Sequence, residues 1–426
     1  MIDLDLIKKL GGYIHGIIDP LHIIDVNNRY QEICPGDLFI VIKGKNRDGI
    51  DFVQNAIDRG AVAILTHTFV PNLSVPQIVV EDTIFFVINY VKNKRKTIRA
   101  KFIGITGSVG KTTLRNTVFN LLPGKKMATR KSFNIKFSIC MSIFLIDNSY
   151  DYIITEIGTN FPGEIEDICR IIKPDYVLIN RVGIEHSEFF LTIKNILLEE
   201  YSIIKYCKYA LSSRHNEKLL QENKLMYILE DINHEFLPEI HEPSFLDIGI
   251  HKIKLSNGEY FEFNKINNIG VLNAVIFVIK FYDLFNLDLT KLERQINNLN
   301  PVCHRGNIIE VNNIIIYDYS YNSNPLSSEV LINSIKEKCT FIAGKMLELD
   351  DIENENQKMI GLLYNNQFIE NIYIVSDINI PEKYQDKIQI FNENFVKDLE
   401  GKIYFQGSNA CNLKDIIFKL INYKIN

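Results

Sequence analysis

Residues 104–113, which read GITGSVGKTT, have the residue types that a loop needs to bind the phosphates of a nucleotide. The common Gly-x4-Gly-Lys spacing would place a glycine at position 105, where Ile105 stands, so this is a shorter form of such a loop. Gly107 and Gly110 permit backbone torsions that other residues avoid, and they let amide N–H groups approach phosphate oxygens. The stretch therefore indicates phosphate-binding chemistry.

The side chains that follow the second glycine add charge and a metal ligand. Lys111 can neutralise the β- and γ-phosphates, and the Thr112 hydroxyl can hold Mg²⁺. The loop follows an apolar strand and opens a helix, whose N-terminus contributes positive partial charge. A chance glycine-rich turn is the alternative, and the Lys-Thr-Thr run argues against it. We predict an ATP site made of Gly107, Ser108, Val109, Gly110, Lys111, Thr112 and Thr113.

A parallel sheet wrapped by helices is the structure that would position this loop. Residues 102–106 form an apolar run before the loop, and residues 150–158 and 174–183 form two more, each separated by helical patterns. Glu156 ends the first of those two runs, at the sheet edge where ligands gather in open α/β sheets. We assign Glu156 to Mg²⁺. The alternative is a solvated carboxylate at the end of a strand.

The chain of 426 residues is too long for one compact core, which predicts two or three domains. Residues 36–42 read as a strand, and a helical pattern then ends at Gly60 before another strand. The charged run 89–100 reads as a solvated helix end or a linker, and we place a boundary there. Strands and helices alternate again beyond residue 306. We expect an N-terminal substrate-binding domain over 1–97, a central ATP-binding domain over 98–299 and a C-terminal Rossmann-like domain over 300–426, all α/β.

Composition narrows the class of protein. Hydrophobic residues make up 46% and charged residues 23%, as in an ordinary globular protein. A net charge of -5 gives no basic patch for nucleic acid, and no apolar run is long enough for a membrane span. The seven cysteines are scattered and unpaired in the sequence, which fits a reducing compartment. We expect a cytoplasmic monomer that acts on small molecules.

Several motifs in this order resemble those of the Mur ligase family. These are the loop TGSVGKTT, the segment GDLFIVIKGKNRDGIDFVQNAIDRGAVAIL, and the motifs TEIGTNFPGEI, LINRVGIEHSE, YDYSYNSNPLSS and GKMLELD. Members of the family use ATP to join an amino acid or peptide to a carboxylate on a nucleotide-linked muramic acid. The last two motifs are the most specific, and they are similar to those of the type that adds D-alanyl-D-alanine.

The resemblance implies an acyl-phosphate mechanism that needs ATP and Mg²⁺, with Lys111, Glu156 and His186 as the catalytic residues. It implies that His186 helps hold the second Mg²⁺, that Asn273 meets the adenine, and that Arg305 and Asp318 reach ATP phosphate and ribose. It also implies substrate contacts from Lys43, Asp48, Gly49, Asn134, Tyr321, Asn322 and Asn324. The residues alone also allow other interpretations. Asn273 could be a helix cap, and Arg305 and Asp318 could form interdomain ion pairs. The predicted substrate residues could simply form polar turns.

The chain departs from the family pattern mainly where substrates are expected. Glu200 stands where many members carry a lysine that becomes carbamylated. It either supplies the carboxylate to the second Mg²⁺ directly or is a surface helix charge beside Glu199, and we hold both interpretations. An Asp-Ser-Arg element is missing, and Arg29-Tyr30-Gln31 or, with an insertion, Asn27-Asn28-Arg29 fills its place. A Lys-Gly-Ser element has become Gln406-Gly407-Ser408. Smaller departures are Ile135, Ile269-Gly270 and Tyr319.

We therefore predict an amide ligase that joins D-alanyl-D-alanine to UDP-N-acetylmuramoyl-tripeptide. Two alternatives stay open at this point: a related ligase of specialised metabolism with another acid and amine, and a non-catalytic ATP-binding protein.

Overall fold

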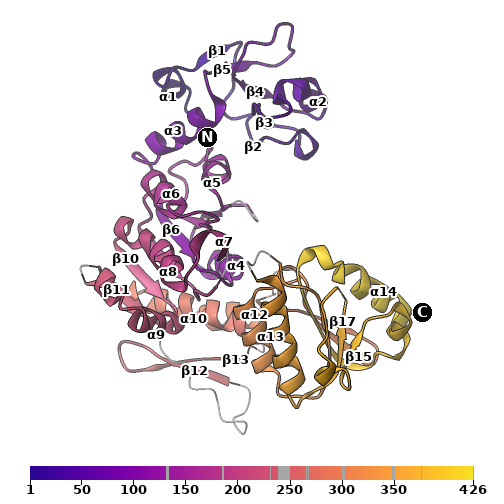
Figure 1. Cartoon of the computed structure of the whole chain (residues 1–426). Coiled ribbons are helices and arrows are strands. Elements are labelled where there is room, and N and C mark those ends of the chain that lie inside the picture. Colours follow the sequence, from indigo (N-terminus) through magenta and orange to yellow (C-terminus); the bar gives the residue numbers. More distant parts are fainter. Residues whose placement is uncertain are drawn as a thin grey trace.

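The structure is a computed structural model of the whole chain, and it describes residues 1–130, 134–184, 187–230, 232–237, 250–264, 266, 268–299, 303–347, 351–375 and 377–425. It is α/β, as predicted, with three large sheets that follow one another along the chain (Figure 1). The sheets use residues 13–79, 101–236 and 307–406. Each predicted domain thus contains one of the large sheets, while the bounds of the domains stay predictions.

The N-terminal sheet has the strand order β1-β5-β4-β3-β2, with β1 antiparallel to β5 and the other pairs parallel. Its strands are β1 (Tyr13–His15), β2 (Asp25–Asn27), β3 (Asp37–Ile40), β4 (Ala63–Thr66) and β5 (Gln77–Val79). Its helices are α1 (Leu4–Lys9), α2 (Val53–Asp58) and α3 (Thr83–Lys94). The predicted helix ends at Asp58, two residues before the expected end at Gly60. Gly60 follows the C-cap with a φ of 105°, and its N–H donates to the carbonyl of Ile57 at 2.9 Å.

The central sheet has the order β11-β10-β9-β6-β8-β7, and all its pairs are parallel. Its strands are β6 (Lys101–Thr106), β7 (Lys126–Ala128), β8 (Tyr152–Glu156), β9 (Tyr176–Ile179), β10 (Tyr209–Ser212) and β11 (His234–Phe236). Helices cover both faces, so β6 is buried from Phe102 onward, as a central parallel strand should be. The helices are α4 (Lys111–Leu121), α5 (Lys136–Ser142), α6 (Glu164–Ile172), α7 (Ser187–Phe190), α8 (Ile193–Tyr201), α9 (Arg214–Glu222), α10 (Ile269–Leu284) and α11 (Leu292–Asn297).

The C-terminal sheet has the order β14-β15-β19-β16-β17-β18, and only β14 runs antiparallel to its neighbour. Its strands are β14 (Asn307–Val311), β15 (Ile314–Tyr319), β16 (Cys339–Ala343), β17 (Ile369–Ile374), β18 (Ile388–Ile390) and β19 (Gly401–Gln406). Its helices are α12 (Pro325–Ser334), α13 (Ile352–Asn365) and α14 (Leu413–Ile425). A separate hairpin of β12 (Ile250–Lys254) and β13 (Tyr260–Asn264) precedes α10.

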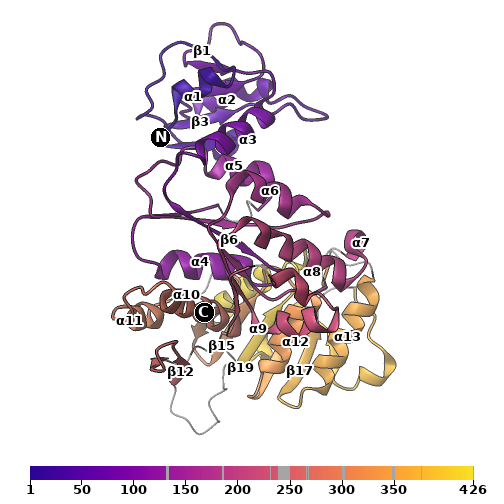
Figure 2. The same cartoon turned by 90° about the vertical axis from the view of Figure 1, so that its left-hand side faces the viewer.

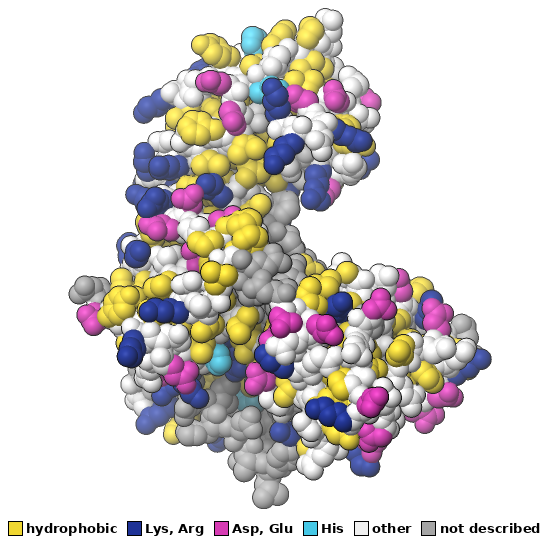
Figure 3. Space-filling model, in the orientation of Figure 1, with side chains coloured by type: hydrophobic (Ala, Val, Ile, Leu, Met, Phe, Trp, Pro, Cys, Tyr) yellow, Lys and Arg dark blue, Asp and Glu magenta, His cyan; other side chains and the backbone are white. Residues whose placement is uncertain are grey.

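The three parts do not lie in one line. The N-terminal part sits on one end of the central part, and the C-terminal part lies beside the other end (Figures 1 and 2). A deep hollow therefore opens between the N-terminal and C-terminal parts, with the central part as its floor (Figure 3). Among the described helices, none is both long and apolar enough to cross a membrane.

The charged run 89–100 is not a solvated linker, and this prediction was wrong. Lys94 is buried, and its Nζ donates to the carbonyls of Met1 at 2.6 Å and Phe144 at 3.0 Å. Arg95 donates to the carbonyl of Ile172 at 2.7 Å and to Asp175 at 3.0 Å. Both cations end α3, which packs between the N-terminal sheet and α5 and α6 (Figure 2). These buried hydrogen bonds join the N-terminal part to the central part.

Candidate active site

The phosphate loop connects β6 to α4 and crosses the end of β9. Gly107 has a φ of 120°, and a Cβ there would lie 2.9 Å from the backbone of Asn180. Gly110 has a φ of 77° and is the N-cap residue of α4, and a Cβ there would lie 2.6 Å from Nδ2 of Asn180. Both positions thus require glycine, for conformation and for space. The Lys111 side chain folds back so that its Nζ donates to the carbonyl of Gly107 at 2.5 Å.

The hydrogen bonds of the loop indicate where a phosphate would bind. The amides of Ser108 and Val109 donate to the carbonyl of Arg181 at 2.9 and 3.2 Å, so these two N–H groups face the protein. The first intrahelical bond runs from Leu114 N–H to the carbonyl of Gly110 at 2.9 Å. The preceding amides of α4 have no intrahelical acceptor, as in any helix. The first turn of α4, with its positive partial charge, is therefore the phosphate-binding element.

Thr112 and Glu156 meet directly in front of this turn. The Thr112 hydroxyl donates to Oε1 of Glu156 at 2.9 Å, and both side chains are buried. The Oε2 atom of Glu156 has no hydrogen-bond partner among the described residues, and Nε of Arg115 is 3.9 Å away. A hydroxyl and a carboxylate with a spare oxygen are ligands that Mg²⁺ prefers. These residues thus fit a magnesium ion.

The two neighbouring glutamates of α8 have different partners. Oε2 of Glu200 accepts from the Thr106 hydroxyl at 2.5 Å and from Gly107 N–H at 2.8 Å, and Glu200 is fully buried at the start of the loop. Glu199 accepts from the amides of Gly163 at 2.7 Å and Ile165 at 3.0 Å, which begin α6. The interpretation of Glu200 as a surface charge was wrong, because the inward side of α8 rests on the loop. A role as metal ligand stays a prediction.

The C-terminal part faces this loop with an arginine. The guanidinium of Arg305 stacks on the ring of Tyr321 at 4.1 Å. Burial lowers the pKa of Arg305, while the negative charge of Glu156 acts in the opposite direction. Arg305 thus brings a cation, attracted by Glu156, from the C-terminal part towards the phosphate loop. From the sequence alone, the alternative for Arg305 and Asp318 was an interdomain ion pair. Arg305 does face a carboxylate of the central part, Glu156, whereas the described partners of Asp318 belong to its own part.

Asp318 lies at the end of β15 and is almost fully buried. Its Oδ2 pairs with Nδ1 of His304 at 2.6 Å, and its Oδ1 accepts from the N–H and hydroxyl of Ser320 at 3.0 and 2.6 Å. His304 has a φ of 61°, which orients its side chain for this contact. Ribose binding by Asp318 stays a prediction, and a ribose would share the carboxylate with His304.

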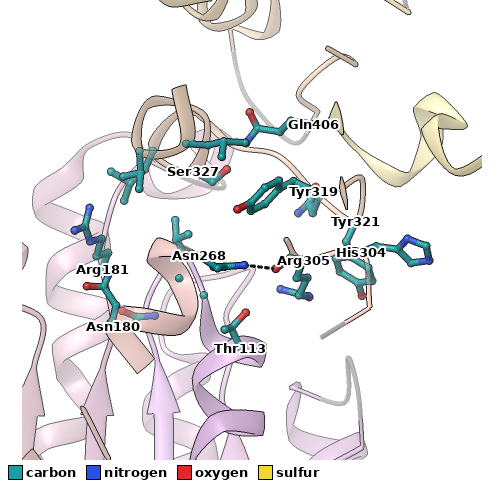
Figure 4. A pocket seen from close by; sticks show the side chains of 18 residues that line it. Thr113, Asn180, Arg181, Asn268, His304, Arg305, Tyr319, Tyr321, Ser327 and Gln406 are labelled. Carbon is teal, nitrogen blue, oxygen red and sulfur yellow. Dashed lines mark hydrogen bonds between the residues drawn. The ribbon is translucent and has the colours of Figure 1, made fainter. Parts of the chain in front are cut away.

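A pocket of about 130 Å³ lies at the junction of the central and C-terminal parts (Figure 4). Asn273, in the second turn of α10, lines it, and Asn268 rather than Asn273 caps that helix, with its Oδ1 accepting from Val271 N–H at 3.1 Å. The phosphate loop and the C-terminal part also contribute to the walls, through Val109, Gly110, Thr113, Arg305, Tyr319, Tyr321, Asn322, Leu326 and Gln406. The pocket adjoins the phosphate-binding turn, since Gly110 and Thr113 belong to its lining.

Unpaired polar atoms gather at this pocket. Among the described residues, Oδ1 of Asn180, Nε of Arg181, Nε of Arg305 and Oε1 of Gln406 are buried without a hydrogen-bond partner. All four residues line the pocket. Buried polar groups are normally paired, so a concentration of unpaired ones in one pocket indicates a polar ligand.

The substrate residues predicted in the N-terminal part form a tight turn. Lys43 and Asp48 bridge across it, and Gly49 N–H donates to the carbonyl of Ile42 at 2.9 Å. Asp48 caps the next turn through Ile50 N–H at 3.1 Å and pairs with Nε2 of His67 at 3.1 Å. These bonds match the turn chemistry that we held as the alternative, and a substrate role stays a prediction.

The other predicted substrate residues belong to the remaining two parts, and of these Tyr321 and Asn322 line the pocket. Asn134 accepts from Gly158 N–H at 2.9 Å, just beyond β8. Asn322 accepts from the Ser408 hydroxyl at 3.5 Å, and Asn324 caps α12 with Ser327 in a capping box. Of the residues implied by resemblance, His186 lies outside the described residues.

Sequence reasoning missed Arg115, Asn180, Arg181, Asn268 and His304, all of which border the site. Asn180 and Arg181 follow directly after β9, and the rule that ligands gather at the carboxyl ends of parallel strands would have indicated them. Arg115 gave no such signal, because its contact with Glu156 depends on how α4 packs on the sheet.

Comparison with known proteins gives a consistent family. Two family profiles match: "Mur ligase family, catalytic domain" over residues 22–105 and "Mur ligase middle domain" over residues 105–231. A UDP-N-acetylmuramoyl-tripeptide–D-alanyl-D-alanine ligase of Rickettsia prowazekii is 28% identical over 76% of this chain and 76% of its own length. The ligase of the same name from Buchnera aphidicola subsp. Baizongia pistaciae is 26% identical over 100% of this chain and 94% of its own.

Solved structures agree in fold. MurF ligase from Thermotoga maritima in complex with ADP superposes with a TM-score of 0.77 at 20% identity, over 96% of this chain and 99% of that one. MurF from Acinetobacter baumannii gives 0.80 at 17% identity, over 99% of both chains.

The chain belongs to the Mur ligase family, as its motifs, its three sheets and its phosphate loop indicated. Within that family it is a divergent member of the MurF type.

Proposed function

We propose that this chain is an ATP- and Mg²⁺-dependent ligase that joins D-alanyl-D-alanine to UDP-N-acetylmuramoyl-tripeptide in peptidoglycan precursor synthesis. Relatives of that name align over 76% and 100% of the chain, which supports the substrate pair. The observation that carries the activity is the Thr112–Glu156 contact of 2.9 Å at the first turn of α4, with Arg305 facing it from the C-terminal part. This arrangement gathers a phosphate cradle, a metal-binding pair and a cation at one point.

In the proposed reaction an oxygen of the acceptor carboxylate attacks the γ-phosphorus of ATP, and ADP leaves with the electrons of the broken P–O bond. The amine nitrogen then attacks the carbonyl carbon of the acyl phosphate. A C–N bond forms, inorganic phosphate leaves, and the nitrogen loses a proton. Such a sequence depends on positioning and charge stabilisation more than on covalent catalysis by the protein.

The chain's own residues divide these tasks. Lys111 and the first turn of α4, with Thr113, hold the phosphates, and Arg305 stabilises charge on the transferred group. Thr112 and Glu156 would hold Mg²⁺, which spreads that charge when bound, and we propose the same for His186 and Glu200. Asn273 and Asp318 bind the nucleoside. Closing the C-terminal part over the loop would exclude water from the acyl phosphate.

Phosphate release from ATP tests this proposal. We expect release to require UDP-N-acetylmuramoyl-tripeptide and D-alanyl-D-alanine together, with mass spectrometry showing one dipeptide added. Lys111→Ala should abolish turnover, while Lys101→Ala, a change at an exposed lysine of the same sheet, should not. ATP binding without release on this pair would refute the proposed substrates.

A second candidate is a MurF-like ligase with a different acid and amine. Gln406 favours it, since a neutral side chain replaces the lysine of the family and its Oε1 is buried and unpaired among the described residues. Loss of that charge removes an anion contact for the substrate. Turnover with other acids and amines, but not with the cell-wall pair, would select this candidate.

We further propose that the enzyme acts in the cytoplasm as a monomer. Its relatives use soluble small molecules, and the predicted site needs no residue from a second chain. Sedimentation velocity at working concentration would test the monomer.

A further inference from the structure

Arg130 connects the central part to the N-terminal sheet. It follows β7, and its guanidinium donates to Oδ1 of Asn27 at 2.7 Å and to the carbonyl of Val26 at 2.7 Å. It also forms an ion pair with Asp25. All three partners belong to β2, the edge strand of the N-terminal sheet. Because the guanidinium is a rigid planar group with several donors, three acceptors on one strand fix both the distance and the angle between the two parts.

The preceding residue holds the ATP side of the site. Thr129 is 1% exposed, and its hydroxyl accepts from the backbone N–H of Glu156 at 3.1 Å. Its carbonyl accepts from the guanidinium of Arg115, and its own N–H donates to the carbonyl of Ile154 at 2.9 Å. The dipeptide 129–130 is therefore bonded to the proposed metal-binding strand at one residue and to the N-terminal sheet at the next.

Hydrogen bonds to the neighbouring segment also fix β2, the strand that Arg130 contacts. Nδ2 of Asn27 donates to Oδ2 of Asp37 at 2.8 Å, and the same oxygen accepts from Cys34 N–H at 3.0 Å. Asp37 is buried and begins β3, which pairs in parallel with β2. A displacement of Arg130 would thus be transmitted into the N-terminal sheet rather than absorbed by a loose strand.

We propose that Arg130 is a positioning residue, which sets the distance over which an acid held by the N-terminal sheet reaches the phosphate loop. This role for Arg130 rests on the proposed function, because the acid is the acceptor substrate of the proposed ligase. In the proposed function one end of the acid is held at the N-terminal sheet, and its carboxylate must then arrive at the first turn of α4. A small error in this distance lowers the rate strongly, because the reacting atoms need close alignment.

Steady-state kinetics and solution scattering on matched variants test this inference. For Arg130→Met we expect kcat/KM for UDP-N-acetylmuramoyl-tripeptide to fall about 10- to 100-fold. The Kd for ADP should stay within about 2-fold, because the described partners of Arg130 lie on β2 and the residues that line the pocket do not include it. Arg130→Lys should recover part of the loss. Arg170→Met, which breaks an exposed ion pair within α6 at 2.8 Å, is the control and should match the wild type.

Asp25→Asn gives an independent measure through a double-mutant cycle. If the two side chains act through their pair, the double variant should be no worse than Arg130→Met alone. Small-angle X-ray scattering of the ADP-bound protein should show the same altered shape for both single variants.

Three outcomes would overturn the proposal. These are unchanged acid kinetics in Arg130→Met, defects of the two single variants that multiply in the double variant, or scattering profiles identical to the wild type. If the wild type does not use the proposed acid, the proposed function fails, but scattering still decides the role of Arg130. If Arg130→Met does not fold, Arg130→Lys and Asp25→Asn carry the same comparison.

Discussion

Neighbouring residues of one helix can serve different structures, and the glutamates of α8 illustrate this. Glu199 satisfies the first amides of α6, which is the usual task of a carboxylate at a helix N-terminus. Glu200 instead holds Thr106 and Gly107, where the phosphate loop begins. A substitution at either position removes one negative charge from the same helix, so the two variants form a matched pair for separating stability from activity.

At the residue scale, we predict that turnover does not need CO₂. Glu200 already carries a carboxylate, so removing dissolved CO₂ and bicarbonate should leave the wild type unaffected. Glu200→Gln should lower turnover about 10- to 100-fold and raise the Mg²⁺ concentration required. Glu200→Lys should be inactive in CO₂-free buffer and regain activity with added bicarbonate, measured as phosphate release.

The control for this prediction is Glu199→Gln. It should lower the melting temperature by removing the cap of α6, with the Mg²⁺ requirement unchanged. Full activity of Glu200→Gln would show that this carboxylate serves only to hold the loop.

The residue types at the phosphate loop were predictable, and their partners were not. Gly107, Gly110, Lys111 and Thr112 form a local pattern whose chemistry can be read directly from the sequence. That Glu200 meets Gly107 depends on the packing of α8, which is 93 residues away along the chain. Arg130 gave no local signal either, because its partners lie more than 100 residues earlier.

At the scale of elements, α12 lies against the segment that follows β9. Leu326 in its first turn lies against Gly183, where a Cβ would be 2.7 Å from Cδ2 of Leu326. The same glycine exchanges two hydrogen bonds with the Ser108 hydroxyl, at 2.9 Å through its carbonyl and 3.0 Å through its N–H. Gly183 thus touches both the phosphate loop and the helix that follows the predicted substrate residues Tyr321, Asn322 and Asn324.

We therefore predict that Gly183→Ala displaces α12. The added methyl group should destabilise the contact by about 1–3 kcal/mol and raise KM for the dipeptide. Leu326→Ala removes the closest atom, so the double variant should recover most of the loss. Steady-state kinetics, with ADP affinity measured alongside, checks this. A double variant as impaired as Gly183→Ala would mean that the contact does not position α12.

The strands and helices themselves were largely predictable. The predicted strands around residues 36–42, 102–106, 150–158 and 174–183 correspond to β3, β6, β8 and β9. Their apolar runs and flanking glycines reflect burial on both faces of a parallel sheet. Because every residue of such a strand is buried, the pattern is visible in the sequence of the strand itself. The cap of α10 was misplaced, since Asn268 and not Asn273 holds that position.

At the scale of the whole molecule, buried cations join the N-terminal part to the central part. Burial lowers the pKa of Lys94 to about 8. An unfolded lysine titrates near ~10.4, so between these values the unfolded chain binds a proton that the folded chain does not. The free energy of unfolding should consequently rise with pH across this window, and the contribution of Lys94 should be constant below it.

We predict that Lys94→Met lacks this rise. The slope of the wild type should exceed that of the variant by up to about 1.4 kcal/mol per pH unit between pH 8 and 10. The variant should also be less stable throughout, because the carbonyls of Met1 and Phe144 lose their donor. Denaturant unfolding at several pH values measures both effects. Parallel slopes would show that Lys94 stays charged in the folded protein.

The prediction for the run 89–100 was wrong because a high density of charged residues usually indicates a solvent-exposed segment. The sequence does not show the partners that bury some of these charges. Three of its partners, Met1, Phe144 and Ile172, come from separate segments and offer a backbone carbonyl, which has no sequence signature. Another, the carboxylate of Asp175, lies 80 residues from Arg95 along the chain.

The pocket at the junction has a kinetic consequence. Its walls come from two bodies, with Asn273 and Thr113 on one and Tyr319 and Leu326 on the other, so a ligand that fills it contacts both (Figure 4). If ADP binds there, as we propose, its dissociation rate should depend on how readily the two bodies separate. A small molecule bound in this pocket would stabilise the contact between the two bodies. Its inhibition would then increase with incubation time as well as with concentration.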